Sequence, residues 1–350
     1  MTIPPKVRRI LTWVGYPVAY LVLFATFAYC TFPYDRLKHR LETGFNAAQQ
    51  TSPEASHLQI GDATWSWRFP GVVLEDIDLI PPLAKVLVAG ETPAERPTIH
   101  AEKVFARVAP LSMLFGTTDV TYDVDGFGGA ISGTLTISGE SKHLIAEFEG
   151  VDPGQLPGVV ESLELPLSGI MTGKIDLRLP EGKISAAEGV VDIEISDLKI
   201  GDGKTKIRGL FALPTLDAGT MKLKATATQG KVKIEQFETK GADIEASGEG
   251  RLRLRDTLGM SMVEQLSLNY KFNDKYRDKD DTTRSLLGKP GDNAPALMDL
   301  DPKVKRAKQA DDSYSWRVTG SFSRLTFTPA LGSSKPGTAA RGLTRPAMSH

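Results

Sequence analysis

Apolar and polar residues alternate with a period of two along most of the chain from Leu58 onward. The clearest runs are Val120–Val124, Ile175–Leu179, Val191–Ile195, Leu223–Ala227 and Leu266–Phe272. Such alternation places one face of a strand in an apolar environment and the other in water, which is typical of antiparallel sheets. No long helical pattern separates the runs, so folds built from β-α-β units are disfavoured. We therefore expect a mainly β fold, an extended and curved antiparallel sheet.

Further runs and a recurring dipeptide support this expectation. Val72–Leu79 reads as a strand with one irregularity, and Trp316–Phe327 closes the series. A hydroxyl residue followed by glycine recurs at or between strands, at Ser132-Gly133, Ser168-Gly169, Thr172-Gly173, Ser247-Gly248 and Thr319-Gly320. Glycine there permits a bulge or a bend. The pattern indicates either a sheet that grows by adding similar units or glycine-rich turns in an ordinary β-domain.

The N-terminal part of the chain follows a different pattern. Residues 10–32 contain no charged residue, and as a helix they would span about 34 Å, enough to cross a bilayer core of about 30 Å. A cleaved signal peptide is the alternative, but its apolar region is shorter and no A-x-A site follows. We interpret 10–32 as a transmembrane helix, with 1–9 as a cytoplasmic stub and the bulk of the chain outside the cytoplasm. The expected membrane-anchor residues are Ile10, Trp13, Tyr16, Leu21, Leu23, Phe24, Phe27 and Phe32.

The remaining segments complete the expected domain organisation. Residues 33–52 have apolar positions at helical spacing, which predicts a juxtamembrane helix that lies either on lipid or on the next domain. Residues 53–330 form the expected β-rich domain. Within it, 273–312 is charge-rich with little periodicity and is expected to be a long exposed loop. Its pieces LLGKPG and PALMDLDP hold apolar residues, so part of the loop could dock locally. The polar segment 331–350 is expected to be a disordered tail.

Composition and motifs argue against catalysis. The 350 residues carry 42 Lys and Arg against 43 Asp and Glu, so the net charge of −1 disfavours nucleic-acid binding driven by bulk charge. Cys30 is the single cysteine, the five histidines are scattered, and no H-E-x-x-H or G-x-S-x-G motif occurs. Nothing selects a pair of carboxylates for hydrolysis. We expect no enzyme activity, and name no catalytic, cofactor-binding or metal-binding residue.

Several short segments, in order along the chain, resemble a known family. They are Phe32–Leu37 (FPYDRL), Gly71–Leu79 (GVVLEDIDL), Ala109–Gly116 (APLSMLFG), Gly150–Pro157 (GVDPGQLP), Leu167–Gly169, Gly173–Leu177 and Trp316–Gly320 (WRVTG). Together they are similar to the longer form of the type II secretion system protein N family, over roughly residues 10–330. The same features occur in the wider AsmA-like group of membrane-anchored, β-rich envelope proteins.

The resemblance implies a single-pass inner-membrane protein of the Gram-negative envelope with its β-domain in the periplasm. It implies a non-catalytic scaffold or assembly role in type II secretion, with other secretion subunits as partners and membrane lipid around the N-terminal helix. The alternative function is AsmA-like lipid binding or transport, in which the apolar face of the sheet lines a groove for lipid chains. The two differ in whether the purified β-domain carries phospholipid.

Overall fold

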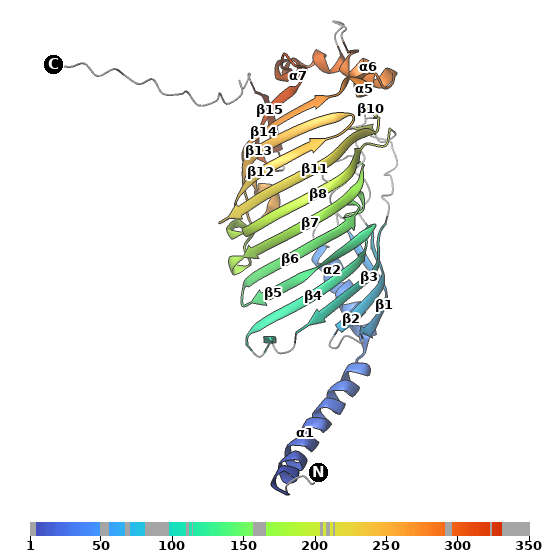
Figure 1. Ribbon diagram of the computed structural model, residues 1–350, viewed down its shortest axis with the longest axis vertical. Coiled ribbons are helices and arrows are strands. Elements are labelled where there is room, and N and C mark those ends of the chain that lie inside the picture. Colours follow the sequence, from blue (N-terminus) through green and yellow to red (C-terminus); the bar gives the residue numbers. More distant parts are fainter. Residues whose placement is uncertain are drawn as a thin grey trace, which may run out of the picture.

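The computed structural model describes residues 5–49, 56–66, 71–80, 98–109, 112–113, 115–156, 166–203, 206–207, 211–212, 214–290, 296–322 and 324–330. Within these ranges the fold is one 14-stranded antiparallel sheet whose strands are neighbours in chain order (Figure 1). A two-stranded hairpin lies apart from it, between β8 and β11 along the chain. The expected fold class, a mainly β and extended antiparallel sheet, is confirmed.

The strands are of similar length, and most are joined to the next by a short connection. They are β1 (His57–Ser66), β2 (Gly71–Ile80), β3 (Ile99–Val108), β4 (Thr117–Gly126), β5 (Gly129–Ser138), β6 (Ser141–Val151), β7 (Leu167–Leu179), β8 (Glu188–Ile200), β11 (Leu216–Thr228), β12 (Lys231–Lys240), β13 (Ile244–Arg253), β14 (Met262–Phe272), β15 (Tyr314–Ser321) and β16 (Arg324–Pro329), with β9 (Lys206–Ile207) and β10 (Phe211–Ala212) forming the separate hairpin. Single 3₁₀ turns occur at η1 (Pro153–Gln155), η2 (Pro180–Gly182), η3 (Ile184–Ala186), η4 (Leu258–Met260) and η5 (Leu297–Leu300).

The irregularity expected in the run from Val72 lies at Asp76, which adopts a positive φ of 52°. The pairing of β2 with β1 and with β3 keeps one register on both sides of Asp76, so no residue is inserted there. A bulge occurs instead in β8, at Asp197, which has φ 52° and where the register with β7 shifts by one residue. This extra residue leaves both Ile195 and Leu198 buried in one cluster, where strict alternation would separate them.

Two helices precede the sheet. α1 (Pro5–Cys30) contains the stretch Thr12–Cys30, which has mean hydropathy 1.5 and is long and apolar enough to cross a membrane. It extends from one end of the long axis of the sheet (Figure 1). α2 (Tyr34–Gln49) follows after a short turn and contacts β1, so the juxtamembrane helix expected at 33–52 is present and packs on the domain.

Side chains of α2 cover the backbone edge of β1, the first strand of the sheet. The Glu42 carboxylate accepts a hydrogen bond from the Ile60 amide at 2.8 Å. The Asn46 amide accepts from the Leu58 N–H at 2.8 Å and donates to the Leu58 carbonyl at 3.2 Å. Lys38 donates to the Gly61 carbonyl at 2.7 Å. An uncovered edge strand is a template for pairing with other chains, so α2 protects this edge.

The segment 273–312 differs from the expected long loop. It folds into α5 (Asp274–Arg277), α6 (Asp281–Leu287), η5 and α7 (Pro302–Ala307), which we call the helical cap. Asp280 and Asp301 accept hydrogen bonds from the first backbone amides of α6 and α7, and Pro302 occupies the first turn of α7. These are ordinary helix-start signals. The helices are too short to show a helical period in the sequence.

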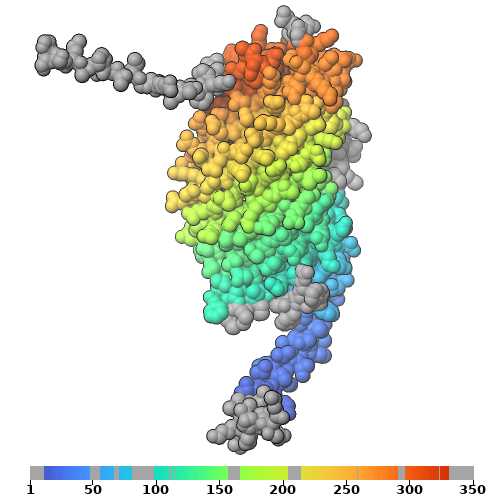
Figure 2. Space-filling model, viewed as in Figure 1, coloured from blue at the N-terminus to red at the C-terminus, as the bar shows by residue number. Residues whose placement is uncertain are grey.

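The helical cap is part of the hydrophobic core. Tyr276, Leu286 and Leu287 are buried against a cluster of sheet residues that includes Val151, Met171, Ile195, Leu216 and Ala218. The Tyr276 hydroxyl donates to the Pro214 carbonyl at 2.8 Å. Arg277, which is also buried, pairs with Asp312 at 3.4 Å. The cap lies at the end of the sheet opposite α1, and the chain proceeds from one to the other in order (Figure 2). The expected tail 331–350 lies outside the described residues, as do residues 1–4 of the stub.

Removing the polar side chains that α2 presents to β1 should expose this edge. We expect Glu42→Ala combined with Asn46→Ala to lower the free energy of unfolding by about 1–3 kcal/mol, because three backbone groups lose their partners. It should also increase self-association in gel filtration. Arg40→Ala, at an exposed position of the same helix, is the control and should change neither. Equal stability and equal elution of all three proteins would show that the edge is not protected in this way.

Alkaline pH should weaken the packing of the helical cap. Burial raises the pKa of Tyr314 to about 12, and burial also raises the pKa of Tyr276. An unfolded chain releases these protons near pH 10, so their contribution to stability is complete below pH 10 and is lost as the pH rises toward 12. Titration by tyrosinate absorbance should show tyrosines that ionise at a pH well above 10, and Tyr314→Phe should remove one of them. A single ionisation step near pH 10 for every tyrosine in the native protein would contradict this burial.

Candidate functional site

The register of the 14 strands brings apolar residues into continuous rows. In the first row, each residue is the direct partner of the next, from the first strand of the sheet to the last. The row is Ala63, Leu74, Val104, Val124, Ile131, Phe148, Gly173, Ile193, Leu223, Phe237, Gly248, Leu268, Trp316 and Pro329.

Two more rows run beside the first on the same face, because residues two apart on a strand share a face. On β12 and on β14, one pair of neighbouring members is three residues apart, and a register shift of one residue lies between them. The second is Trp65, Val72, Ala106, Tyr122, Gly133, Ala146, Ile175, Val191, Ala225, Ile234, Gly250, Leu266, Val318 and Phe327. The third runs from β3 to β16 as Val108, Val120, Leu135, Leu144, Leu177, Gly189, Ala227, Val232, Leu252, Val263, Gly320 and Leu325.

We call these three rows the apolar face, and none of their residues is charged. Fourteen strands spaced about 4.8 Å apart make it about 60 Å long. Its one hydroxyl, on Tyr122, donates to the Ile145 carbonyl at 3.0 Å, and the Tyr122 ring covers Gly133. The face therefore presents hydrocarbon and aromatic surface without a charged side chain, and its one hydroxyl is paired with a backbone carbonyl.

Much of the apolar face is only half buried. Trp65, Val108 and Phe327 are 50%, 37% and 48% exposed, and most other large residues of the rows are of intermediate exposure. In a sheet whose face is closed by a second layer, such side chains would be fully buried. Among the described residues, Ile131, Phe148 and Ile193 of the first row pack against the buried cluster that also holds the apolar residues of the helical cap. The face thus resembles the floor of a groove more than a closed core.

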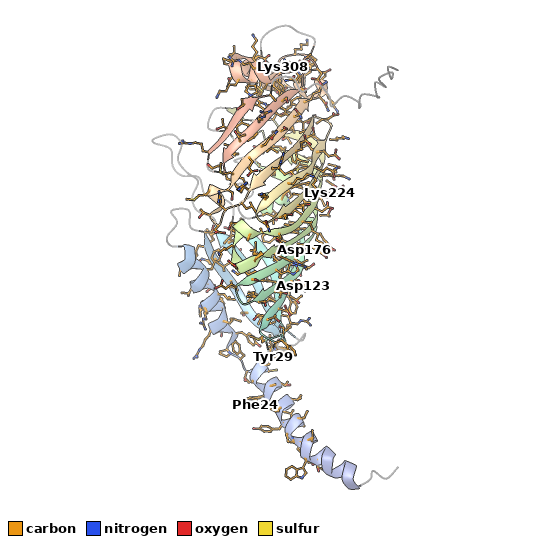
Figure 3. The ribbon with its side chains drawn as sticks, turned by 90° about the vertical axis from the view of Figure 1, so that its left-hand side faces the viewer. Phe24, Tyr29, Asp123, Asp176, Lys224 and Lys308 are labelled. Atoms are coloured by element: carbon orange, nitrogen blue, oxygen red, sulfur yellow. The ribbon has the colours of Figure 1, made fainter. Side chains whose placement is uncertain are left out.

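The opposite face of the sheet is polar and held by ion pairs between neighbouring strands. Lys174 pairs with Glu147 at 2.6 Å, and Lys224 pairs with Asp192 at 3.0 Å. His143 contacts Asp176 at 2.7 Å. Figure 3 shows Asp123, Asp176 and Lys224 on one side of the sheet and α2 on the other. Exposed pairs of this kind add little stability, and we interpret this face as the solvated one.

Other hollows of the described chain carry charge. A depression of about 670 Å³ is lined by Glu75, Lys103, Asp123 and Asp125, and one of about 440 Å³ is lined by Lys199, Asp243 and Lys279. Lys279 pairs with Asp243 at 3.6 Å in the second hollow. Within the described ranges, no group of three histidine, cysteine or acidic residues could hold a metal ion.

The predicted anchor residues lie along α1 and just beyond it. Trp13, Tyr16, Leu21, Leu23, Phe24, Phe27 and Phe32 are all exposed, and none of the stretch Thr12–Cys30 is buried by the rest of the chain. Phe24 projects away from the helix, clear of the sheet (Figure 3). The side chain of Ile10 lies outside the described part. An apolar helix whose side chains are exposed along most of its length needs an apolar surrounding, as in a membrane.

Tyr29 is an aromatic residue near the end of the predicted membrane helix and is not one of the predicted anchor residues. It joins α1 to the sheet. Its hydroxyl donates to the Ser66 carbonyl at 2.8 Å and contacts the Gly71 carbonyl, and it accepts from the Gly71 amide at 2.8 Å. The Tyr29 ring packs edge-on against Trp65, with 6.4 Å between ring centres. Tyr34 donates to the Tyr29 carbonyl at 2.8 Å, and burial beside Tyr29 raises the pKa of Tyr34 to about 12. These aromatic residues fix the end of α1 at the start of the apolar face.

Comparisons with protein-family models, with curated proteins and with solved structures found no match to this chain. The apolar face and its junction with α1 are therefore the basis for the proposal of a function.

Proposed function

We propose that this protein is a membrane-anchored, non-catalytic protein that holds lipid acyl chains along the apolar face of its sheet. The observation that carries the proposal is the unbroken register of uncharged residues across all 14 strands. A continuous apolar face is expected on a sheet when that face is kept out of water. Hydrocarbon chains would supply that surrounding over the part of the face that the described helices leave half exposed.

The energetics favour acyl chains as the ligand. Transfer of hydrocarbon from water to an apolar surrounding gains about 0.8 kcal/mol per methylene group, so a long chain gains several kcal/mol even when partly covered. A charged head group has no partner on the apolar face and would remain in water at its margin. The polar face of the sheet, with its ion pairs, would stay hydrated.

We place α1 in the inner membrane of a Gram-negative cell and the sheet in the periplasm. This placement rests on the family resemblance of the sequence and on the length and hydropathy of Thr12–Cys30. The sheet would then stand on the membrane, because its long axis continues from the end of α1 (Figure 1). Lipid held along the face would lie on a path leading away from the bilayer.

A charge placed on the apolar face should remove the lipid. Val191 lies in the second row between Ile175 and Ala225, whereas its neighbour Val190 is 49% exposed on the polar face. We expect Val191→Glu to lower the phospholipid that copurifies with the full chain by about tenfold or more, because a carboxylate against hydrocarbon costs on the order of 2 kcal/mol or more. Val190→Glu, the same change on the same strand, should leave the lipid unchanged.

The measurement is phospholipid per protein after mild solubilisation, by extraction and by native mass spectrometry. Circular dichroism should first show that both variants keep the strand content of the wild type. Leu266→Glu against Ser267→Glu repeats the comparison on β14 if Val191→Glu does not fold. Wild-type protein free of lipid, or equal lipid in the two variants, would defeat the proposal.

A second proposed function is the scaffold role in type II secretion that the family resemblance implies. The observation that favours it is the last strand of the sheet, β16, whose Leu325 and Phe327 are 41% and 48% exposed. A strand of another subunit could pair with this edge, since strand addition uses backbone hydrogen bonds and alternate side chains. The first edge is protected by α2, so the two edges of the sheet are not equivalent.

Site-specific crosslinking in cells separates this second proposal from the first. A photoreactive residue at Thr326 of β16 should capture a subunit of the secretion apparatus, and one at Gln59 of β1 should not, because α2 covers that edge. Both positions are exposed. Absence of a secretion subunit from the Thr326 product, with the protein present at its normal level, would count against the scaffold.

A further inference from the structure

A pocket lies at the place where the membrane helix meets the apolar face. Its volume is about 430 Å³, within the range of about 300–1,000 Å³ that is usual for small-molecule sites. One wall is formed by Tyr29, Phe32 and Leu37, from the end of α1 to the start of α2. The other wall is formed by Val72, Ala106 and Val108 of β2 and β3. Val72 and Ala106 belong to the second row of the apolar face, and Val108 begins the third.

The chemistry of the pocket fits hydrocarbon and does not fit a head group. None of its lining residues is charged. The Tyr29 and Tyr34 hydroxyls are used by backbone groups of Ser66, Gly71 and Tyr29. A phosphate or an amine would lose its water there without gaining a partner, which costs several kcal/mol, whereas a methylene chain loses nothing.

The position of the pocket relative to a bilayer is set by its own residues. Tyr29, Phe32 and Tyr34 form a cluster of aromatic rings with centres 5.2–6.2 Å apart. Tyrosine in such clusters collects at the level of the lipid head groups. Hydrogen bonds from Tyr29 to the first turn of the sheet hold the pocket in a fixed orientation to α1. With α1 in the membrane, the pocket is therefore at the surface of the leaflet nearest the sheet.

We propose that this pocket is the entrance through which one acyl chain of a membrane phospholipid leaves the adjacent leaflet and reaches the apolar face. This inference rests on the proposed lipid-holding function and adds the place and direction of loading. The acyl chain passes between α2 and β3, and the head group stays in water beside it. The rows that begin at Val72 and Val108 then continue without a charged residue to β16.

Filling the pocket with a bulky side chain tests the entrance. Ala106→Trp places an indole in the pocket, and Arg107→Trp places the same group on the opposite face of the same strand, where residue 107 is exposed. The full chain is reconstituted in vesicles of phosphatidylethanolamine and phosphatidylglycerol that contain phosphatidylethanolamine with a photoreactive acyl chain. After illumination, the labelled residues are identified by mass spectrometry. Val108→Trp replaces Ala106→Trp if the latter does not fold.

The wild type and Arg107→Trp should be labelled at the pocket and at rows beyond β4. Ala106→Trp should lose the labels beyond β4 in vesicles. When the same lipid is supplied in detergent solution, it should reach the face directly, and Ala106→Trp should be labelled there as the wild type is. Equal labelling of Ala106→Trp and Arg107→Trp in vesicles would contradict entry through the pocket, but not lipid binding along the apolar face. No labelling of the wild type in either medium would contradict both proposals.

Discussion

The structure depends on one constraint, that a sheet with an uncharged face must keep that face out of water. Globular domains meet it with a second layer of structure. Here α2 contacts β1 at one edge of the sheet, and the helical cap packs on a buried cluster that includes Met171 and Ile195. The three rows of apolar residues nevertheless cross the sheet with many large side chains half exposed. Hydrocarbon from a lipid would be the missing layer.

The other features of the molecule follow from this arrangement. The polar face can be solvated and carry ion pairs such as Lys174–Glu147, because it does not have to pack against an apolar layer. Bulges in β12, between Ile234 and Phe237, and in β14, between Val263 and Leu266, keep the rows on one face where the register shifts by one residue. Tyr29 fixes the apolar helix to the first strands, so α1 and the apolar face meet at a defined place. Each feature maintains a continuous apolar surface that starts beside α1.

The strands and their two faces were predictable from the sequence, because an alternation such as Ile175-Asp176-Leu177 depends only on neighbouring residues. The rows were not, since they require the pairing register of every adjacent strand, and no local pattern specifies that Gly173 pairs with both Phe148 and Ile193. The anchor helix was predictable from length and hydropathy. The junction between this helix and the sheet was not predictable, because Tyr29 bonds to residues about forty positions away that only the fold brings near it.

The helical cap shows another limit. Asp301 followed by Pro302 is a helix-start signal that the sequence analysis overlooked, and Asp280 with Thr283 is a second, in an unusual capping box. The apolar piece that contains Leu287 indicated local docking, but the partners of Tyr276 and Leu287 could not be seen in the sequence, because they lie on distant strands. Local charge density is a poor guide to exposure where short helices fold onto a large sheet.

The most direct test of the account is an electron cryomicroscopy map of the full chain in a lipid nanodisc. The account predicts elongated density that belongs to no residue, lying along the rows from Val72 toward Phe237 and beginning beside Tyr29. A map in which polypeptide covers this face along its whole length, with side chains packed as in a closed core, would contradict it.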